Sequence, residues 1–447
     1  MPKDTRLADI VDFIHDLTFD DLPDTVKTRV ELCLLDLVGV GYGGATTDLS
    51  RIIRAHAHRH FAGSGKARIL FDGRTASALG AALAGGMTID ALDAHDGYNP
   101  AKGHIGCGLF PAALAFAQET GLQDGREFLT NIVIGYELGS RLAAALHATV
   151  PDYHTSGAWV SVAAAAVGAR MTGLDRDQTR HAVGIAEYHG PRSQMMREID
   201  FPTMVKDGSG WGAMAGASAV WLAADGFTGA PAITMEGADA APFWADLGQT
   251  WRIMDQYFKP YPVCRWAQSP IEAVLGLKRT HDLTSDMVDH VEITTFHESI
   301  RLATKDPKTT EEAQYSTSYP CAVALVKGIV GIDEVSQAAF ADPEVRRIST
   351  GLIMHEDDYC NRHFPIQRYA KAVIFLKDGR ALTSGFTSPR WTAEDPPTEA
   401  ELRTKFHGLA DPLLGRARAE ALEQAIAALS TGGDLIVFSD LVCQPLP

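Results

Sequence analysis

The stretch from Asp90 to Pro111 combines the residue types that acid–base chemistry requires. Its sequence, DALDAHDGYNPAKGHIGCGLFP, holds three acids, two histidines and a lysine between two apolar runs. Charged side chains between buried helices lose hydration, so they need either partners among themselves or a ligand in a cavity. A solvated loop after a helix is the plain alternative. We interpret the stretch as an active-site turn.

Cationic side chains stand at two further places where a protein core would not hold them. Lys206 precedes a helix pattern of small residues, and Lys259 and Arg265 frame the segment KPYPVCR at a predicted domain junction. Such cations can bind carboxylates and offset the charge of an enolate-like intermediate. The set can therefore bind a ligand that carries carboxylate groups.

Candidate acid/base groups come from three separate segments. His104 lies in the turn, His154 precedes a helix pattern, and Tyr319 opens a helix in the C-terminal half. Histidine titrates near neutrality, which suits proton transfer at a carbon α to a carboxylate. A helix cap around His154 and a packed core tyrosine at Tyr319 are the competing interpretations. The sequence leaves open which group takes the proton.

Helical periodicity dominates the first 225 residues. Helices are predicted over 5–37 (two, with Pro23 opening the second), 48–60, 75–89, 110–120, 125–147, 156–172, 177–187 and 208–224. The run from Gly39 to Gly44 matches G-x-G-x-x-G, but a helix precedes it and no acid follows at the distance that a dinucleotide site needs. We predict a helix end and a glycine turn there.

The pattern changes after Pro260. Alternating β-branched residues predict strands at 288–296 and within 370–386, with a helix at 316–328 between them. The sequence Thr398-Glu-Ala-Glu401 matches a capping box, after which helices return. The prediction is a mainly α protein with a large all-helical domain (residues 1–258 and 396–447) and a smaller α+β lid domain (residues 259–395).

Composition argues against several classes of protein. A formal net charge of −16 disfavours nucleic acid and anionic membranes as partners, because both need a basic surface. The six cysteines form no C-x-x-C pair, so structural zinc or a disulfide framework is not expected, and reduced thiols fit a cytoplasmic location. The longest uncharged run, residues 208–224, is rich in small residues and falls short of the roughly 20 apolar residues of a membrane span.

Several segments resemble the MmgE/PrpD family, which includes 2-methylcitrate dehydratase, cis-aconitate decarboxylase and iminodisuccinate epimerase. They are residues 93–111, Lys259-Pro-Tyr-Pro-x-Cys-Arg265, Tyr315-Ser-x-x-Tyr319, and residues 226–229 with 236–237. The resemblance covers nearly the whole chain. It implies a helical domain with a smaller α+β lid, a homodimer, no cofactor, and an active site at the domain interface; we expect no metal site.

By motif, the resemblance also indicates site residues. Those on active-site positions of the family are Asp93, His104, His154, Lys206, Lys259 and Tyr319, and we add Arg265 and Asp96 as substrate-binding candidates beside Lys259. Two positions depart from the family: Gly97 stands where the decarboxylase branch has a hydroxyl residue, and Gln268 stands where histidine is common. Both departures argue against decarboxylation and, less directly, against dehydration.

The sequence therefore predicts a cofactor-independent epimerase of a small iminodicarboxylate such as iminodisuccinate, which acts by proton abstraction and return at the carbon α to a carboxylate. A dehydratase-like lyase or a decarboxylase acting on a small polycarboxylate is the alternative. Two further classes of protein are alternatives: a metal-dependent hydrolase or lyase using Asp90, Asp93, His95 and Asp96, and a binding protein without activity.

Overall fold

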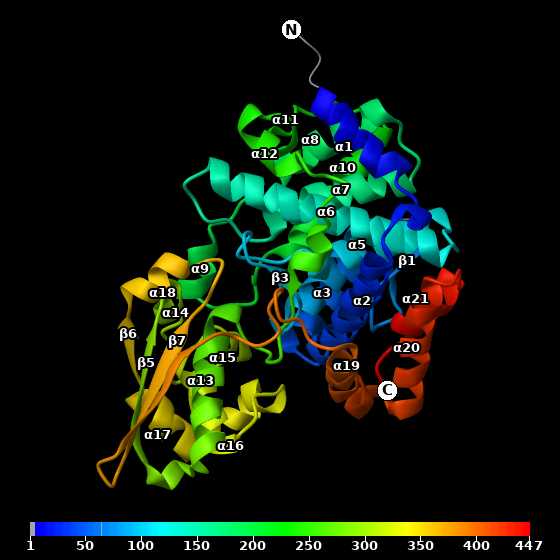
Figure 1. The fold of residues 1–447 in the computed structure, drawn as a ribbon. Coiled ribbons are helices and arrows are strands. Elements are labelled where there is room, and N and C mark those ends of the chain that lie inside the picture. Colours follow the sequence, from blue (N-terminus) through cyan, green and yellow to red (C-terminus); the bar gives the residue numbers. More distant parts are fainter. Residues whose placement is uncertain (1–4, 64) are drawn as a thin grey trace.

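The computed structural model describes residues 5–63 and 65–447, and helices make up most of it. Figure 1 shows a large helical part beside a smaller part that contains a sheet, which confirms the predicted fold class. The larger part is called the helical body. Its main helices are α1 (Thr5–Asp16), α2 (Asp24–Gly44), α3 (Asp48–His60), α4 (Ala78–Asp90), α5 (Gly106–Thr120), α6 (Gly125–Thr149), α7 (Gly157–Met171), α8 (Arg176–His189), α10 (Ser209–Ala224), α11 (Ile233–Glu236), α12 (Ala241–Trp244), α19 (Glu399–Leu414), α20 (Arg416–Leu429) and α21 (Leu435–Val442).

The smaller part is called the lid segment. It consists of α13 (Arg265–His281), β5 (Val288–Thr295), α14 (His297–Arg301), α15 (Thr310–Gln314), α16 (Ser318–Lys327), α17 (Pro343–Gly351), β6 (Ile353–Glu356), α18 (Asp358–His363), β7 (Ala370–Leu376) and β8 (Ala381–Thr387). Its sheet has the order β6-β5-β7-β8; β5 and β6 are parallel and the other pairs are antiparallel. The sequence did not predict β6, because that strand is short and largely exposed and shows no apolar alternation.

Small residues let the central helices of the body approach closely. A Cβ atom added at Gly86 of α4 would lie 2.6 Å from the Cα atom of Gly210 in α10, and one added at Gly212 would lie 2.4 Å from the carbonyl oxygen of Gly157 in α7. Real side-chain carbons do not approach so closely. The glycines therefore set the spacing of α4, α7 and α10, whose ends carry the polar residues described below.

The glycine run in α2 corrects one prediction. We expected a glycine turn at residues 39–44, but α2 continues through Gly44. A Cβ atom at Gly41 would lie 2.4 Å from the Phe71 ring, and one at Gly44 would lie 2.1 Å from the carbonyl oxygen of Thr88. These glycines permit close packing within a helix, and no turn is needed to explain them.

The C-terminal helices pack on the N-terminal ones. Figure 1 shows the orange-to-red helices α19 to α21 beside the blue α2. The predicted capping box is confirmed, since the Thr398 side chain accepts from the backbone of Glu401 and Glu401 accepts in return. From α19, Lys405 donates to Asp36 Oδ1 (2.6 Å) and to the carbonyl oxygen of Ala94 (2.8 Å), so this helix supports the turn that holds Asp93 and His104.

Two hydrophobic cores follow this division. The first takes side chains between Ile10 and Phe258 and between Leu402 and Cys443, and the second takes side chains between Tyr261 and Leu376. Met195 and Ile199 of α9 (Met195–Asp200) also belong to the second core, although α9 precedes the lid segment in sequence. The domain limits at 258/259 and 395/396 stay a prediction.

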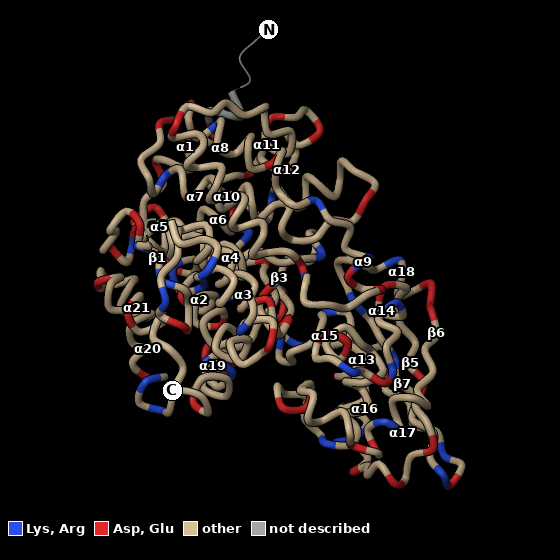
Figure 2. The backbone as a smooth tube through the Cα atoms, turned by 180° about the vertical axis from the view of Figure 1, so that it is seen from behind, with Lys and Arg blue, Asp and Glu red and all other residues tan. Residues whose placement is uncertain are grey.

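Two further features bear on partners. No helix within residues 5–63 and 65–447 is long and apolar enough to cross a bilayer. Figure 2 shows Lys and Arg interspersed with Asp and Glu over both parts of the chain. Binding of a charged ligand therefore depends on local clusters of charge, such as the one around Lys259 and Asp93.

The contact between α4 and α10 gives a test of the packing. Gly86→Val should destabilise the protein by about 1–3 kcal/mol, because the new side chain has no space against Gly210. At about 2–4 °C per kcal/mol, the melting temperature should fall by roughly 2 °C or more. As a control, Gly408→Ala adds a Cβ into open space on α19 and should leave the melting temperature unchanged or raise it. Equal melting temperatures for both variants would contradict this packing.

Candidate active site

A buried ion pair joins the lid segment to the helical body. Lys259 Nζ donates to the carbonyl oxygen of Asp93 at 2.7 Å and also to Asp93 Oδ1, and both side chains are almost wholly buried. Asp93 follows the end of α4 with a φ of 49°, which turns its carboxylate back toward Lys259. Burial alone would lower the pKa of Lys259, but the Asp93 carboxylate outweighs it and raises that pKa. Lys259 therefore stays an ammonium ion in this buried position.

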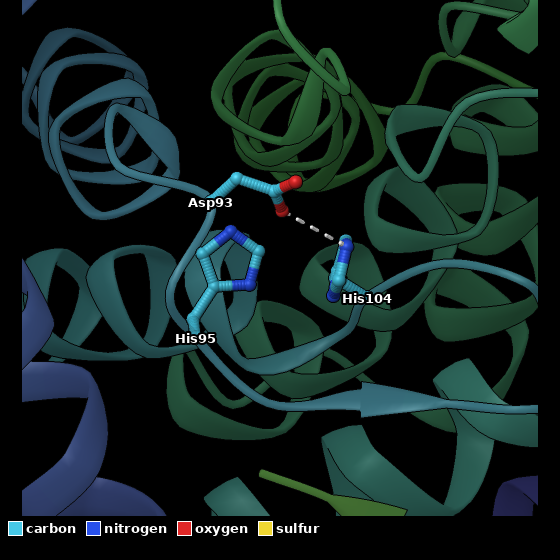
Figure 3. Close-up of side chains that lie close together, drawn as sticks. All are labelled: Asp93, His95 and His104. Atoms are coloured by element: carbon cyan, nitrogen blue, oxygen red, sulfur yellow. Dashed lines mark ion pairs between the residues drawn. The ribbon is translucent and has the colours of Figure 1, made fainter. Parts of the chain in front are cut away.

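His104 lies beside this pair, and Figure 3 shows its ring turned toward Asp93. Its Nε2 atom is 3.6 Å from Asp93 Oδ1 and 3.9 Å from Asp207 Oδ2. Its Nδ1 atom is 2.5 Å from the carbonyl oxygen of Asp96, which can only accept, so Nδ1 carries the hydrogen. Burial, and then the charge of Lys259, lowers the pKa of His104 well below its ordinary value. His104 is thus a neutral imidazole with a lone pair on Nε2.

His95 is held in the opposite state. Its ring centre is 4.3 Å from that of His104, and the rings are nearly perpendicular. Both of its nitrogens face acceptors: Nε2 is 3.1 Å from Asp90 Oδ1, and Nδ1 is 3.3 Å from the carbonyl oxygen of Asp96. Burial opposes charge here, but Cys107 and the bond to Asp90 outweigh it and raise the pKa of His95 well above its ordinary value. His95 is an imidazolium that neutralises Asp90.

These contacts decide whether the cluster suits a metal ion. The donor atoms of Asp93, His95 and His104 lie within 4.8 Å of one another, which is close enough for a shared ion. A metal needs lone pairs, however, and His95 donates from both nitrogens while the Lys259 ammonium occupies Asp93. His95 therefore has no lone pair to offer, and the charge of Asp93 is already balanced by Lys259. The donor set fits proton transfer better than metal binding.

Asp207 is a site residue that the sequence analysis did not single out. The Ser156 hydroxyl donates to Asp207 Oδ2, and the same hydroxyl oxygen accepts from the backbone N–H of His104 at 2.8 Å. Burial, and then the charge of Asp90, raises the pKa of Asp207 to about 7. Asp207 can therefore hold or release a proton near neutrality, opposite His104. Its position directly after Lys206 was the available signal.

Lys206 lies at the edge of a cavity. It is 1% exposed; its Nζ atom donates to Gln314 Oε1 of the lid segment at 2.6 Å and lies 4.4 Å from the centre of the Tyr315 ring. The cavity has a volume of about 560 Å³, and Thr155 and Glu198 also line it. Neither carboxylate oxygen of Glu198 has a hydrogen-bond partner, and burial raises the pKa of Glu198 well above its ordinary value. The cavity thus offers a cation and a neutral acid to a ligand.

Three predicted residues direct their side chains to partners outside this cluster. His154 Nδ1 lies 3.3 Å from the carbonyl oxygen of Arg192, and its ring stacks on His147. The Tyr319 hydroxyl donates to the carbonyl oxygen of Glu334 at 2.8 Å, because α16 buries this ring in the core of the lid segment. The Asp96 carboxylate accepts a hydrogen bond from the Tyr136 hydroxyl, and the backbone carbonyl of Asp96 accepts one from His104 Nδ1. In the Tyr315-Ser-x-x-Tyr319 motif, Tyr315 is the tyrosine that reaches the site.

Arg265 holds the junction between the two parts. Its Nη1 atom donates to the carbonyl oxygens of Phe258 (3.0 Å) and Arg390 (2.9 Å), where the chain enters and leaves the lid segment. It also donates to Gln268 Oε1, and the Gln268 amide donates to the carbonyl oxygens of Tyr261 and Val263. Gln268 therefore supports the segment from 259 to 265.

Comparison with known proteins places this arrangement in a family. The profile of the MmgE/PrpD N-terminal domain matches residues 8–243, and that of the MmgE/PrpD C-terminal domain matches residues 261–431. The chain belongs to the MmgE/PrpD family.

Its relatives include a cis-aconitate decarboxylase-like protein of Aspergillus oryzae. The two are 24% identical over an alignment of 492 positions, gaps included, which covers 100% of this chain and 98% of the relative. The cis-aconitate decarboxylase of Aspergillus terreus is 21% identical (98% and 96% covered), and that of Mus musculus is 23% identical (97% and 92% covered). These relatives are lyase-type enzymes by name, and their similarity spans both parts of the chain.

Asp207 gives a test of the electrostatics. In the unfolded chain its carboxyl ionises near 3.8, and in the folded protein near 7, so ionisation costs stability only when folded. Asp207→Asn should be closest in stability to the wild type near pH 4, where Asp207 of the folded protein is neutral. Its stability relative to the wild type should rise as the pH increases from about 4 to about 7, and the difference should stay constant above pH 7. Melting temperatures of both proteins from pH 4 to 8 test this, and parallel curves would contradict it.

Proposed function

We propose that this protein is a lyase that acts on a small polycarboxylate through an enolate-like intermediate next to a carboxylate. The observation that carries the proposal is the His104 Nε2 lone pair, which lies 3.6 Å from Asp93 Oδ1 of the Lys259–Asp93 pair and 3.9 Å from Asp207 Oδ2. The similarity to cis-aconitate decarboxylases supports a lyase-type reaction.

The roles of the residues follow from their charge states. Lys259 and Lys206 bind carboxylate groups and offset the charge of the intermediate. His104 exchanges a proton with the substrate carbon through Nε2. In an elimination, His104 takes the proton, the C–H electron pair forms the double bond, and the leaving hydroxide takes a proton from Asp207. In a decarboxylation, CO₂ leaves, the electron pair of the broken C–C bond stays on the substrate carbon, and protonated Asp207 supplies the proton to that carbon.

Epimerisation is the second candidate, and Gly97 favours it. A Cβ atom at Gly97 would lie 2.4 Å from the Tyr257 hydroxyl oxygen and 2.8 Å from His104 Nδ1, so the hydroxyl residue of the decarboxylase branch has no space here. An epimerase of an iminodicarboxylate needs only proton removal and return. His104 and Asp207 are the two groups that would exchange it, and a role for His154 or Tyr319 would require movement toward the cluster.

The reaction class can be tested directly. Purified protein with EDTA is incubated in D₂O with cis-aconitate, 2-methylcitrate or iminodisuccinate, and the products are followed by NMR. We expect a new unsaturated acid, or loss of CO₂, from a polycarboxylate. Deuterium exchange with interconversion of stereoisomers alone would favour the epimerase. Absence of any turnover or exchange with all three compounds would overturn the proposal.

His104 should be essential to whichever reaction is found. His104→Gln should lower kcat by a factor of about 10²–10⁴, because it removes the acid/base group but keeps a polar side chain. His281→Gln, at the exposed end of α13, is the matched control and should keep wild-type kcat. A His104→Gln variant with kcat within threefold of the wild type would exclude His104 as the proton-transfer group.

We also propose a homodimer in the cytoplasm. One face of α10 presents an uncharged, mostly apolar stripe at helical spacing that the described residues do not fully bury: Trp211, Met214, Ala215, Ser218, Trp221 and Leu222. Exposed Phe201 and Val205 precede it. A face of this kind is typical of homodimer interfaces, so a second copy of the chain is the proposed partner. The six buried free thiols support a reducing compartment.

The stripe predicts which surface change breaks the dimer. Leu222→Glu should convert a dimer to a monomer, because it places a charge within an apolar interface. Ile436→Glu on α21 changes a similarly exposed residue (42% against 37%) elsewhere on the helical body and should leave the dimer intact. Light scattering coupled to size exclusion measures both. A monomeric wild type, or a dimeric Leu222→Glu variant, would contradict the assignment.

A further inference from the structure

Arg368 is a buried arginine of the lid segment that reaches the active-site turn. It lies two residues before β7 and is 2% exposed. Its Nη1 atom donates to Asn99 Oδ1, and the Asn99 amide donates to the carbonyl oxygen of Ile366 at 2.9 Å. The guanidinium is therefore held where the lid segment meets the turn of the helical body.

The other edge of this guanidinium has no partner. Nε and Nη2 are buried without a hydrogen bond, and no carboxylate within residues 5–63 and 65–447 forms an ion pair with Arg368. The N–H groups of Nε and Nη2 point from one edge, which is the edge that binds a carboxylate through two parallel hydrogen bonds. A buried charge without a partner is costly, so this edge requires an anion.

The surroundings of Arg368 connect it to the proton-transfer group. Its guanidinium lies 5.5 Å from the centre of the Tyr257 ring, and that ring is 6.5 Å from the ring of His104. Arg265 lies over the same ring at 4.4 Å. Burial, Lys259 and then other charges including Arg368 lower the pKa of His104. Arg368 is thus one aromatic ring away from His104.

The cations around Tyr257 exceed the anions that pair with them. Lys259 pairs with Asp93, and the Nη groups of Arg265 donate hydrogen bonds to Gln268 and to backbone carbonyl oxygens. Arg368 alone keeps a complete carboxylate-binding edge. Sequence analysis gave no signal for it, because it lies outside every motif and its burial depends on how the lid segment meets the turn.

We propose that the Nε and Nη2 edge of Arg368 binds one carboxylate of a small dicarboxylate whose other end lies at His104 and Lys259. The inference rests on the proposed function for the class of ligand, and it adds the residue that selects a second carboxylate. The competing explanation is that Arg368 only positions the turn through Asn99.

The test compares two ligands that differ by one carboxylate. Succinate and butanoate have the same four-carbon chain, and calorimetry gives the dissociation constant of each without any need for turnover. The wild type should bind succinate more tightly. Arg368→Gln should weaken succinate binding by about tenfold or more, as expected for lost hydrogen bonds to a charged group, and leave butanoate binding within threefold. Arg368→Lys keeps the positive charge but cannot form the two parallel hydrogen bonds. Its dissociation constant for succinate should lie between those of the wild type and Arg368→Gln.

Two controls separate binding from support of the turn. Asn99→Ala removes the contact to Nη1 and should keep the preference for succinate, and Arg380→Gln removes an exposed lid cation and should bind both ligands as the wild type does. If Arg368→Gln does not fold, Arg368→Lys carries the test. An unchanged succinate preference in the folded Arg368 variants, an equal loss in Asn99→Ala, or a wild type that does not bind succinate would overturn the inference. Arg368-dependent binding without turnover would instead support it and count against the proposed lyase.

Discussion

The buried pair of Lys259 and Asp93 is the constraint on which the rest of the site depends. Either charge alone would lose its hydration at a cost of several kcal/mol, and each is tolerated because the other is within hydrogen-bond distance. The pair fixes the chain just before α13 of the lid segment against the end of α4. It also gives His104 Nε2 a charged neighbour at 3.6 Å, so the contact that joins the two parts also shapes the candidate catalytic group.

Two neighbouring histidines show how partners set protonation. His95 and His104 have ring centres 4.3 Å apart and are both buried, yet one is charged and the other neutral. His95 faces two acceptors, whereas His104 meets an acceptor only at Nδ1 and lies near the Lys259 ammonium. Asp207, with a pKa of about 7, is the third member of this set. His95, His104 and Asp207 therefore differ in pKa although they lie close together. Such differences are what acid–base catalysis near neutrality requires.

Small residues bring this set together. The close approaches of α4, α7 and α10 at Gly86, Gly157, Gly210 and Gly212 place the ends of three helices side by side. Asp90 ends α4, Ser156 precedes α7, and Asp207 precedes α10. Polar groups at helix ends are then linked by hydrogen bonds across short gaps, with Asp207 bonded to both Ser156 and Asp90. A larger side chain at these glycines would separate the ends.

The sequence by itself determined the helix-rich fold, the strands β5, β7 and β8, the cap of α19 and the turn that holds Asp93 and His104, because these depend on local periodicity and residue type. It did not determine that α2 continues through its glycines, because only packing against Phe71 and Thr88 shows why they are needed. The tertiary structure alone decided that Tyr315 reaches Lys206 while Tyr319 faces the core of the lid segment. It also decided that Arg368 meets the turn, since burial and charge pairing arise between segments far apart in the chain.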